Sequence, residues 1–312
     1  MIVLHTLAPL VLIVVLGLVL RRGGFMPAEF YRGINRLVYW VGLPALLFDK
    51  TSEAGGVGGQ AMHVFLIMLA GTLGCVALAL GLGRLLRVER RSLGAFVQGS
   101  YRGNLAYVGL AVVLFSFGDD SPWNKVAALG MAPMVPIYNL IAVVALTAGQ
   151  DHHDGSAAAR AWRMAVRVIT NPLLLACAAG LVVSMAPQAL PLFARRTFRT
   201  VGQMALPLAL LGIGASLSFH HLRAGWSQVT AASILKLVIT PLLGAAAAWG
   251  LGASPEATRI ALVMLACPTA VASYVMAEQL GADDRLAGGI VLMTTIASVG
   301  SLAAVLLLVP AG

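Results

Sequence analysis

The sequence predicts an all-α integral membrane protein of ten transmembrane helices, arranged as two five-helix halves in an inverted repeat. Three observations predict it: an apolar composition, ten apolar runs, and landmarks that recur at one offset. Of 312 residues, 59% are hydrophobic and only 11% are charged, and the mean hydropathy is +0.90. Soluble domains carry about 25% charged residues, so we expect lipid to surround most of this chain.

The apolar runs are each close to the roughly 20 residues that span a bilayer. Short polar segments separate them, which leaves no room for a soluble domain. We therefore expect a first five-helix repeat over 1–150, a short cytoplasmic loop over 151–163, and a second, inverted repeat over 164–312. The expected helices are 2–20, 33–49, 61–83, 93–117, 125–148, 164–186, 200–218, 227–250, 258–278 and 285–309.

The repeat is indicated by helix-breaking and small residues that keep one register. At an offset of 163 residues, three residues of the first half find identical residues in the second. Because five helices are an odd number, the second half must enter the membrane from the opposite side, as in many secondary transporters. The three pairs are Pro9 with Pro172, Gly17 with Gly180, and Pro44 with Pro207.

The net charge of +9 comes from basic clusters in short loops. This placement is typical of the positive-inside rule and argues against nucleic-acid binding. The distribution predicts a multi-pass protein of the cell inner membrane with both termini on the non-cytoplasmic side. Arg195–Arg199 opposes this orientation, and we expect it on an interfacial segment after Pro191.

The fourth and ninth expected helices contain the residues that weaken a helix most. Helix four has Gly99–Asn104 followed by Gly109, and helix nine has Ala266–Ala270 around Pro268. Interrupted helices at matching repeat positions indicate a transport site. The half-helix N-termini then attract a carboxylate, with Asn104 as an additional donor. The alternative is a pair of ordinary kinks that serve packing.

Two hydroxyl residues and two basic residues accompany these breaks. Thr269 and Ser273 either contact the substrate or bond back to their own helix. Arg102 either pairs with an anion or extends to the cytoplasmic surface. Lys236, placed inside helix eight, either neutralises carbonyls of a broken helix or holds an ion pair.

Acidic residues are expected only at the ends of spans, where Asp49 closes helix two and Glu278 closes helix nine. A positive centre without acids favours an anion over a cation. Cys75, Cys177 and Cys267 lie in apolar segments without metal spacing, so we expect packing roles. His152-His153 and His220-His221 read as loop residues. No metal site and no cofactor is predicted.

Several motifs resemble the auxin efflux carrier family, in order and over nearly the whole chain. Their specificity lies in the set rather than in any one of them. They are Gly33–Val38 with Leu43–Phe48, Asn104 with Gly109, Asn171-Pro172, Leu206-Pro207 with Gly212–Leu217, and Ala266–Ala272 with Ala277-Glu278.

The resemblance, which extends to PIN auxin carriers and malonate or malate permeases, implies a fold similar to bile-acid symporters and NhaA-like transporters. Helices four and nine then cross at the substrate site, a transport bundle moves against a scaffold, and a homodimer forms. Two departures stand out: no acid lies in helix three, and Leu110 follows Gly109 where the family has proline. The expected substrate residues are Leu43, Pro44, Arg102, Asn104, Tyr107, Asn171, Pro268, Thr269, Ala270 and Ser273, supported by Gly103, Gly109, Pro207 and Lys236.

The leading hypothesis is a secondary transporter of small organic anions, mono- or dicarboxylates or auxin-like acids, working by alternating access. Na⁺ or H⁺ are the candidate coupling ions, and membrane lipid is the surrounding partner. The alternatives are a sodium-coupled symporter of the bile-acid type and a membrane-embedded enzyme. An enzyme needs a nucleophile with a base or an acidic metal motif, and the only candidate is Asp119-Asp120 in a loop.

Overall fold

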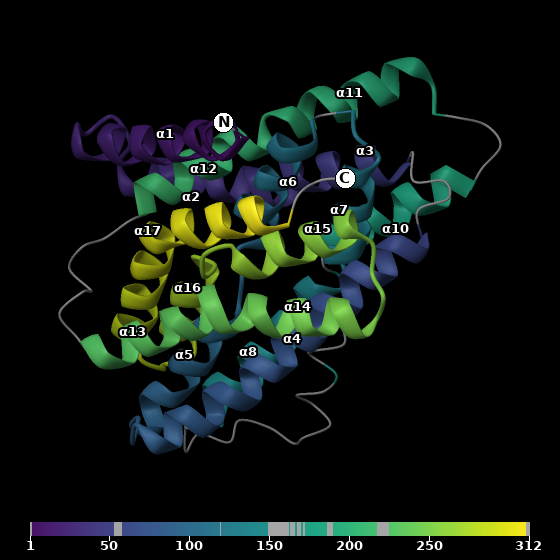
Figure 1. Ribbon diagram of the computed structural model, residues 1–312. Coiled ribbons are helices and arrows are strands. Elements are labelled where there is room, and N and C mark those ends of the chain that lie inside the picture. The colour runs from purple at the N-terminus through teal and green to yellow at the C-terminus, as the bar shows by residue number, and fades with distance from the viewer. Residues whose placement is uncertain are drawn as a thin grey trace.

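The computed structural model describes residues 2–52, 58–118, 120–148, 162, 166, 170, 172–185, 190–216 and 225–309. Within these ranges the secondary structure is helical apart from one isolated β-bridge (Figure 1). Asn171, both histidine pairs, Asp119 and nearly all of the expected 151–163 loop lie outside the described residues.

The first half of the chain follows the expected helix order. Two expected spans are interrupted, at 102–104 and at 132–133. The expected helix 33–49 begins earlier, at Ala28, and contains a π-helical turn. The elements are α1 (Ile2–Arg22), α2 (Ala28–Leu37), η1 (Val38–Gly42), α3 (Leu43–Ser52), α4 (Gly58–Leu85), α5 (Arg90–Tyr101), η2 (Leu105–Gly109), α6 (Leu110–Phe117), α7 (Trp123–Met131) and α8 (Met134–Thr147).

The second half is interrupted in a similar way. Of the expected helix 164–186, only its later part is described as a continuous helix. The elements are α10 (Pro172–Met185), α11 (Leu192–Gln203), α12 (Ala205–Ser216), α13 (Trp226–Ile234), η4 (Leu235–Ile239), α14 (Thr240–Gly250), α15 (Pro255–Ala266), α16 (Ala272–Gln279) and α17 (Asp284–Leu308).

Prolines account for most of these local irregularities. A proline has no amide hydrogen and clashes with the carbonyl one turn earlier, so the helix must widen or bend there. The π-helical turns η1 and η4 each end two residues before a proline, Pro44 and Pro241 respectively. A turn at Met204 separates α11 from α12 just before Pro207.

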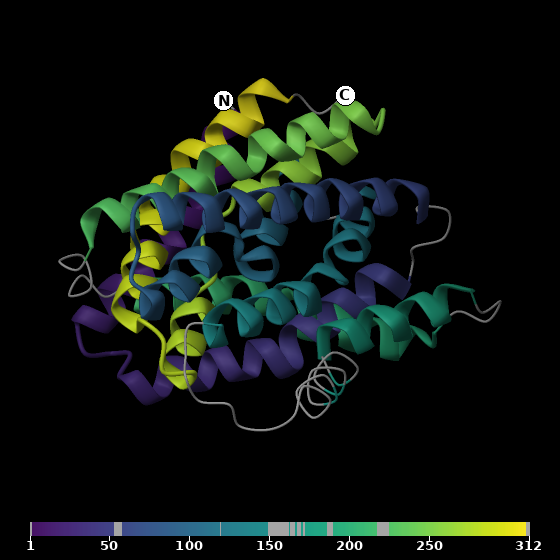
Figure 2. The same ribbon diagram turned by 90° about the horizontal axis from the view of Figure 1, so that it is seen from below.

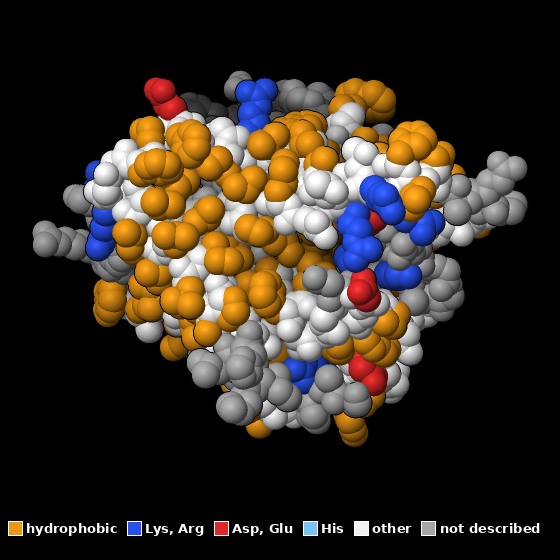
Figure 3. Space-filling view, turned by 90° about the horizontal axis from the view of Figure 1, so that it is seen from above, with side chains coloured by type: hydrophobic (Ala, Val, Ile, Leu, Met, Phe, Trp, Pro, Cys, Tyr) orange, Lys and Arg blue, Asp and Glu red, His pale blue; other side chains and the backbone are white. Residues whose placement is uncertain are grey.

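Five of the described helices, or runs of two or three adjoining segments, are long and apolar enough to cross a membrane. Among the others, α1 contains Pro9 and the two helices of the crossing described below are interrupted. The five are Gly58–Leu85, Trp123–Thr147, Leu192–Ser216, Trp226–Gly250 and Asp284–Leu308. Apolar side chains also cover most of the face seen in Figure 3, with basic side chains gathered toward its edges.

The helices pack as two groups, and each group contains elements from both halves of the chain (Figures 1 and 2). In the first group, α1 packs on α12 while α10 and α11 pack on α3. In the second, α4 lies against α14 and α15, and α17 contacts α13, α15 and α16. The two groups meet where α1 contacts α6 and α17, and where α12 contacts η2.

Glycines allow the close helix contacts of the first group. A Cβ on Gly17 of α1 would lie 2.2 Å from the Leu211 carbonyl oxygen of α12, and one on Gly180 of α10 would lie 2.0 Å from the Thr51 hydroxyl of α3. Small residues let backbones approach in this way inside membranes. The same close packing therefore occurs at two positions that the 163-residue offset relates.

Candidate functional site

The two broken helices predicted from the sequence are interrupted and cross each other. The chain leaves α5 at Tyr101 and resumes helical structure at Leu105, and it leaves α15 at Ala266 and resumes in α16 at Ala272. Pro268 disfavours the helical conformation for Cys267, whose φ and ψ are −65° and 155°. The α5 break has no proline, so glycine and the crossing partner hold it open.

At the crossing, the two extended stretches pair as a short antiparallel β-bridge between Gly103 and Thr269. The Asn104 amide donates to the Pro268 carbonyl at 2.8 Å, and the Ala270 amide donates to the Arg102 carbonyl at 3.0 Å. Backbone groups freed at membrane depth must find protein or water partners. Here, the backbone groups freed in one break form hydrogen bonds with those freed in the other.

Gly103 and Gly109 permit the close approach of the two chains. A Cβ on Gly103 would lie 2.9 Å from the Cys267 sulfur, and one on Gly109 would lie 2.6 Å from the Met264 sulfur. Neither glycine has a positive φ. Both are thus explained by space rather than by backbone conformation, and the supporting role expected for them has a geometric basis.

The carbonyl ends of the half-helices are closed by side chains. The fully buried Lys236 of η4 donates through Nζ to the Leu265 carbonyl at the end of α15. A cation at a helix C-terminus is favourable because it faces the negative end of the helix dipole. Lys236 thus bonds a carbonyl at a broken-helix end, no described carboxylate pairs with it, and its supporting role stays a prediction.

Thr269 closes the other half-helix. Its hydroxyl donates to the Gly99 carbonyl of α5 at 2.7 Å, and its amide donates to the Thr294 hydroxyl of α17 at 3.0 Å. The sequence offered substrate contact or a bond to its own helix, and the hydroxyl instead bonds across the crossing. The Ser273 hydroxyl is buried and has no hydrogen-bond partner.

Arg102 points inward and does not extend to the surface, because its side chain is only 8% exposed. Its guanidinium donates to the Asn139 side-chain oxygen of α8 at 2.6 Å and contacts the Met276 sulfur of α16. With the Gln98 amide oxygen turned toward it, Gln98 also accepts from Arg102 at 2.9 Å. Among the described residues, no carboxylate is within ion-pair distance of this charge.

The first amides of η2 and of α16 have no carbonyl of their own helix to bond, because no helical turn precedes them. Asn104 is buried at the start of η2, where its carbonyl accepts from Val108 and Gly109 at 3.0 Å each. The Tyr107 hydroxyl donates to the Asn35 carbonyl of α2 at 3.4 Å. The crossing therefore combines half-helix N-termini, a buried amide and a buried guanidinium, which together suit a carboxylate.

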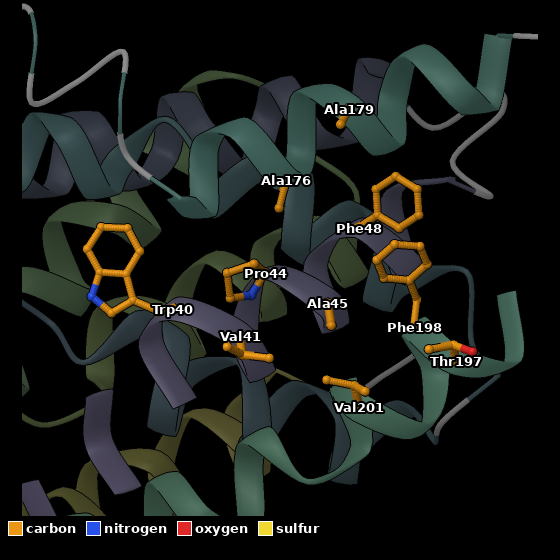
Figure 4. Close-up of a pocket in the computed structure, with 10 residues that line it drawn as sticks. All are labelled: Trp40, Val41, Pro44, Ala45, Phe48, Ala176, Ala179, Thr197, Phe198 and Val201. Atoms are coloured by element: carbon orange, nitrogen blue, oxygen red, sulfur yellow. The ribbon is translucent and has the colours of Figure 1, made fainter. Parts of the chain in front are cut away.

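Among the described residues, no hydrogen bond links Leu43 or Pro44 to this crossing. Leu43 is fully buried, whereas Pro44 lines an apolar groove of about 510 Å³ between α3, α10 and α11 (Figure 4). The rings of Phe48 and Phe198 face each other there with centroids 4.4 Å apart. None of the crossing residues lines this groove. Pro207 is exposed at the start of α12.

Two further charged residues are buried near the ends of expected spans. Arg259 is a third buried base at 2% exposure, and it donates to the Val309 carbonyl and the Ser116 hydroxyl. Asp49 does not close helix two, because it is buried within α3, which continues to Ser52. A helix that packs inside the protein buries charged residues near its ends as well.

Sequence reasoning missed three residues that hold the site together: Gln98, Asn139 and Thr294. Each is an uncharged polar residue within an expected span, and that is the only signal the sequence carried for them. The described residues contain no group of three His, Cys, Asp or Glu that suits a metal ion.

Comparison with known proteins agrees with a transporter. A family described as membrane transport protein matches residues 2–149 and 159–306. The chain is 26% identical over 294 residues to a Rhizobium meliloti protein named "Putative malonate transporter", covering 92% of this chain and 89% of the relative. It is 24% identical over 301 residues to an "Uncharacterized transporter" of Methanothermobacter thermautotrophicus, covering 96% and 95%.

Proposed function

The chain belongs to the membrane transport protein family, and so to the auxin efflux carriers that its sequence resembles, and we propose that it is a secondary transporter of small carboxylates. One observation carries this proposal. The buried Arg102 lies beside the crossing of two broken helices, and none of its described partners is a carboxylate. A buried charge without a counter-ion is unfavourable, so an anionic substrate is the natural partner.

In the proposed mechanism, the carboxylate binds between Arg102 and the half-helix N-termini that begin at Asn104 and Ala270. The guanidinium supplies the charge, while the amides and the Asn104 side chain orient the oxygens. Malonate, which the name of the Rhizobium meliloti relative mentions, makes dicarboxylates the first substrates to test. Membership of a transporter family favours transport over the alternative of a membrane-embedded enzyme.

Sodium coupling is the second candidate, and the contacts at the crossing argue against it. Backbone carbonyls could bind Na⁺, but four of those at or beside the crossing already accept hydrogen bonds. Lys236 and Thr269 donate to the carbonyls of Leu265 and Gly99. The carbonyls of Arg102 and Pro268 accept backbone amides. These four carbonyls are less available to a cation, and uptake with and without sodium distinguishes the two candidates.

The proposed movement is an elevator-type displacement of the second helix group against the first. The two groups, each built from both halves, and the related close contacts of Gly17 and Gly180 support the inverted repeat of ten helices. A homodimer in the inner membrane, with both termini on the non-cytoplasmic side, completes the proposal.

The experiment is carboxylate binding and uptake with purified protein in liposomes, with and without sodium or a proton gradient. Asn104→Ala and Arg102→Gln should each weaken malonate binding. A charged hydrogen bond contributes about 1.5–3 kcal/mol, so the Arg102→Gln effect should be roughly 10- to 150-fold. Asn124→Ala, in α7, is the control, because the Asn124 amide caps the Gly118 carbonyl away from the crossing. Unchanged uptake in both site variants would refute the proposed site.

A further inference from the structure

Neutral groups hold the Arg102 side chain in place. The side-chain oxygen of Asn139, in α8, accepts a hydrogen bond from Arg102 Nη2 at 2.6 Å. The side-chain oxygen of Gln98, in α5, accepts one from Arg102 Nη1 at 2.9 Å. Gln98 also donates to the Ser273 carbonyl of α16 at 3.3 Å. The guanidinium is thereby fixed relative to α5, α8 and α16, yet its positive charge is left uncompensated by its described neighbours.

The residue at position 139 determines whether that charge is available. Asparagine and aspartate have nearly the same shape, so an aspartate would fit and would form a close ion pair with Arg102. Such a pair would neutralise the guanidinium, whereas a neutral amide accepts its hydrogen bond and leaves the charge. The chain instead has the residue that orients the guanidinium without neutralising it.

We infer that Asn139 is a specificity-determining residue: its neutral amide positions Arg102 while keeping the guanidinium charge for a substrate carboxylate. Gln98 does the same from the other side and links the guanidinium to the first turn of α16. This inference rests on the proposed function, and it adds that the selection for anions depends on a residue that need not touch the anion.

The test compares Asn139→Asp with Asn139→Leu, which removes the acceptor but adds no charge. Malonate, succinate and acetate are titrated into each purified protein by calorimetry. Asn139→Asp should weaken binding of the carboxylate that binds the parent protein by about 10- to 150-fold. The aspartate would pair with Arg102, so the substrate would lose one charged hydrogen bond to the guanidinium. Asn139→Leu should weaken binding less than Asn139→Asp does, since the guanidinium loses one of its two positioning acceptors but keeps its charge.

Thermal unfolding without carboxylate provides a second readout, which a purely structural role for Asn139 would not move in the same direction. Asn139→Asp should unfold at or above the parent's temperature because it gains an ion pair, whereas Asn139→Leu should unfold below it. A variant that is more stable and yet binds less anion is the signature of an arginine charge that has been neutralised.

Two results would overturn the inference alone. One is unchanged carboxylate binding by Asn139→Asp in a protein whose binding is lost in Arg102→Gln. The other is an equal loss of binding in Asn139→Leu and Asn139→Asp, since shape rather than charge would then matter. If the parent protein binds no carboxylate at all, the proposed function fails and this inference fails with it.

Discussion

Replacing Gly103 with alanine adds one methyl group at the point where the two broken helices cross. The new Cβ would lie 2.9 Å from the Cys267 sulfur and 3.2 Å from both the Met264 carbonyl oxygen and the Leu105 side chain. Favourable contacts lie at about 3.5–4.0 Å, so the sulfur is too close by roughly 0.6–1.1 Å. The two extended stretches must therefore separate by several tenths of an ångström.

The expected loss of stability follows from that separation. Overpacking a well-packed site costs about 1–3 kcal/mol. The bonds that join the crossing, from Asn104 to Pro268 at 2.8 Å and from Ala270 to Arg102 at 3.0 Å, lengthen at the same time. We expect Gly103→Ala to lower the free energy of unfolding by about 2 kcal/mol and to reduce carboxylate uptake.

A second substitution separates crowding from other effects. Cys267→Ala removes the sulfur, so the double variant should lose less stability than the sum of the two single changes, by about 1 kcal/mol. Gly300→Ala is the matched control, because a Cβ there meets nothing within 4 Å and the residue lies inside α17. That control should be neutral or stabilising by up to about 1 kcal/mol, as alanine is the better helix former.

The assay is denaturant unfolding in mixed micelles, followed by helical circular dichroism, for the parent, both single variants, the double variant and the control. Uptake in liposomes is measured on the same proteins. If Gly103→Ala is as stable and as active as the parent, or if Cys267→Ala restores nothing, the close approach at Gly103 does not hold the crossing together and the reasoning is wrong.

Two further predictions test the supports of the site. Thr269→Val keeps the side-chain shape but leaves the buried Gly99 carbonyl without its donor, so stability should fall by about 1–3 kcal/mol in the same unfolding assay; an unchanged midpoint would contradict this role. Arg259→Gln removes the hydrogen bonds to Val309 and Ser116, so the free energy of unfolding should fall by a similar amount while the malonate dissociation constant stays unchanged. A weakened malonate affinity would instead place Arg259 in the site.

The sequence identified where the helices break but not what fills the breaks. Pro268 and the glycines around Asn104 weaken a helix for local reasons, and local reasons are visible in a sequence. Lys236 was placed inside the membrane for a similar reason, since a base in an apolar run is conspicuous. Its partner, the Leu265 carbonyl, is a backbone group, and no residue type marks it.

Contacts between distant segments account for what sequence reasoning missed. Asn139 matters because the fold brings it to Arg102, 37 residues away in the sequence, and Thr269 reaches a carbonyl 170 residues away. An uncharged polar residue in a span does not indicate which helix it faces, and even Gln98, one helical turn before Arg102, gains its role only once α16 lies beside it. Pro44 is a separate case: a motif resemblance placed it in the substrate site, the structure shows that it lines an apolar groove, and its contact with substrate stays a prediction.

The mutual pairing of the two breaks also has a consequence for how the protein is made. During synthesis the first break enters the membrane long before Pro268 and Ala270 exist, so the Asn104 amide and the Arg102 carbonyl lack their native partners. Unpaired backbone groups are strongly unfavourable in lipid. The unfinished chain must therefore keep this segment hydrated or shielded by the insertion machinery, and the binding site is completed only when nearly the whole polypeptide has entered the bilayer.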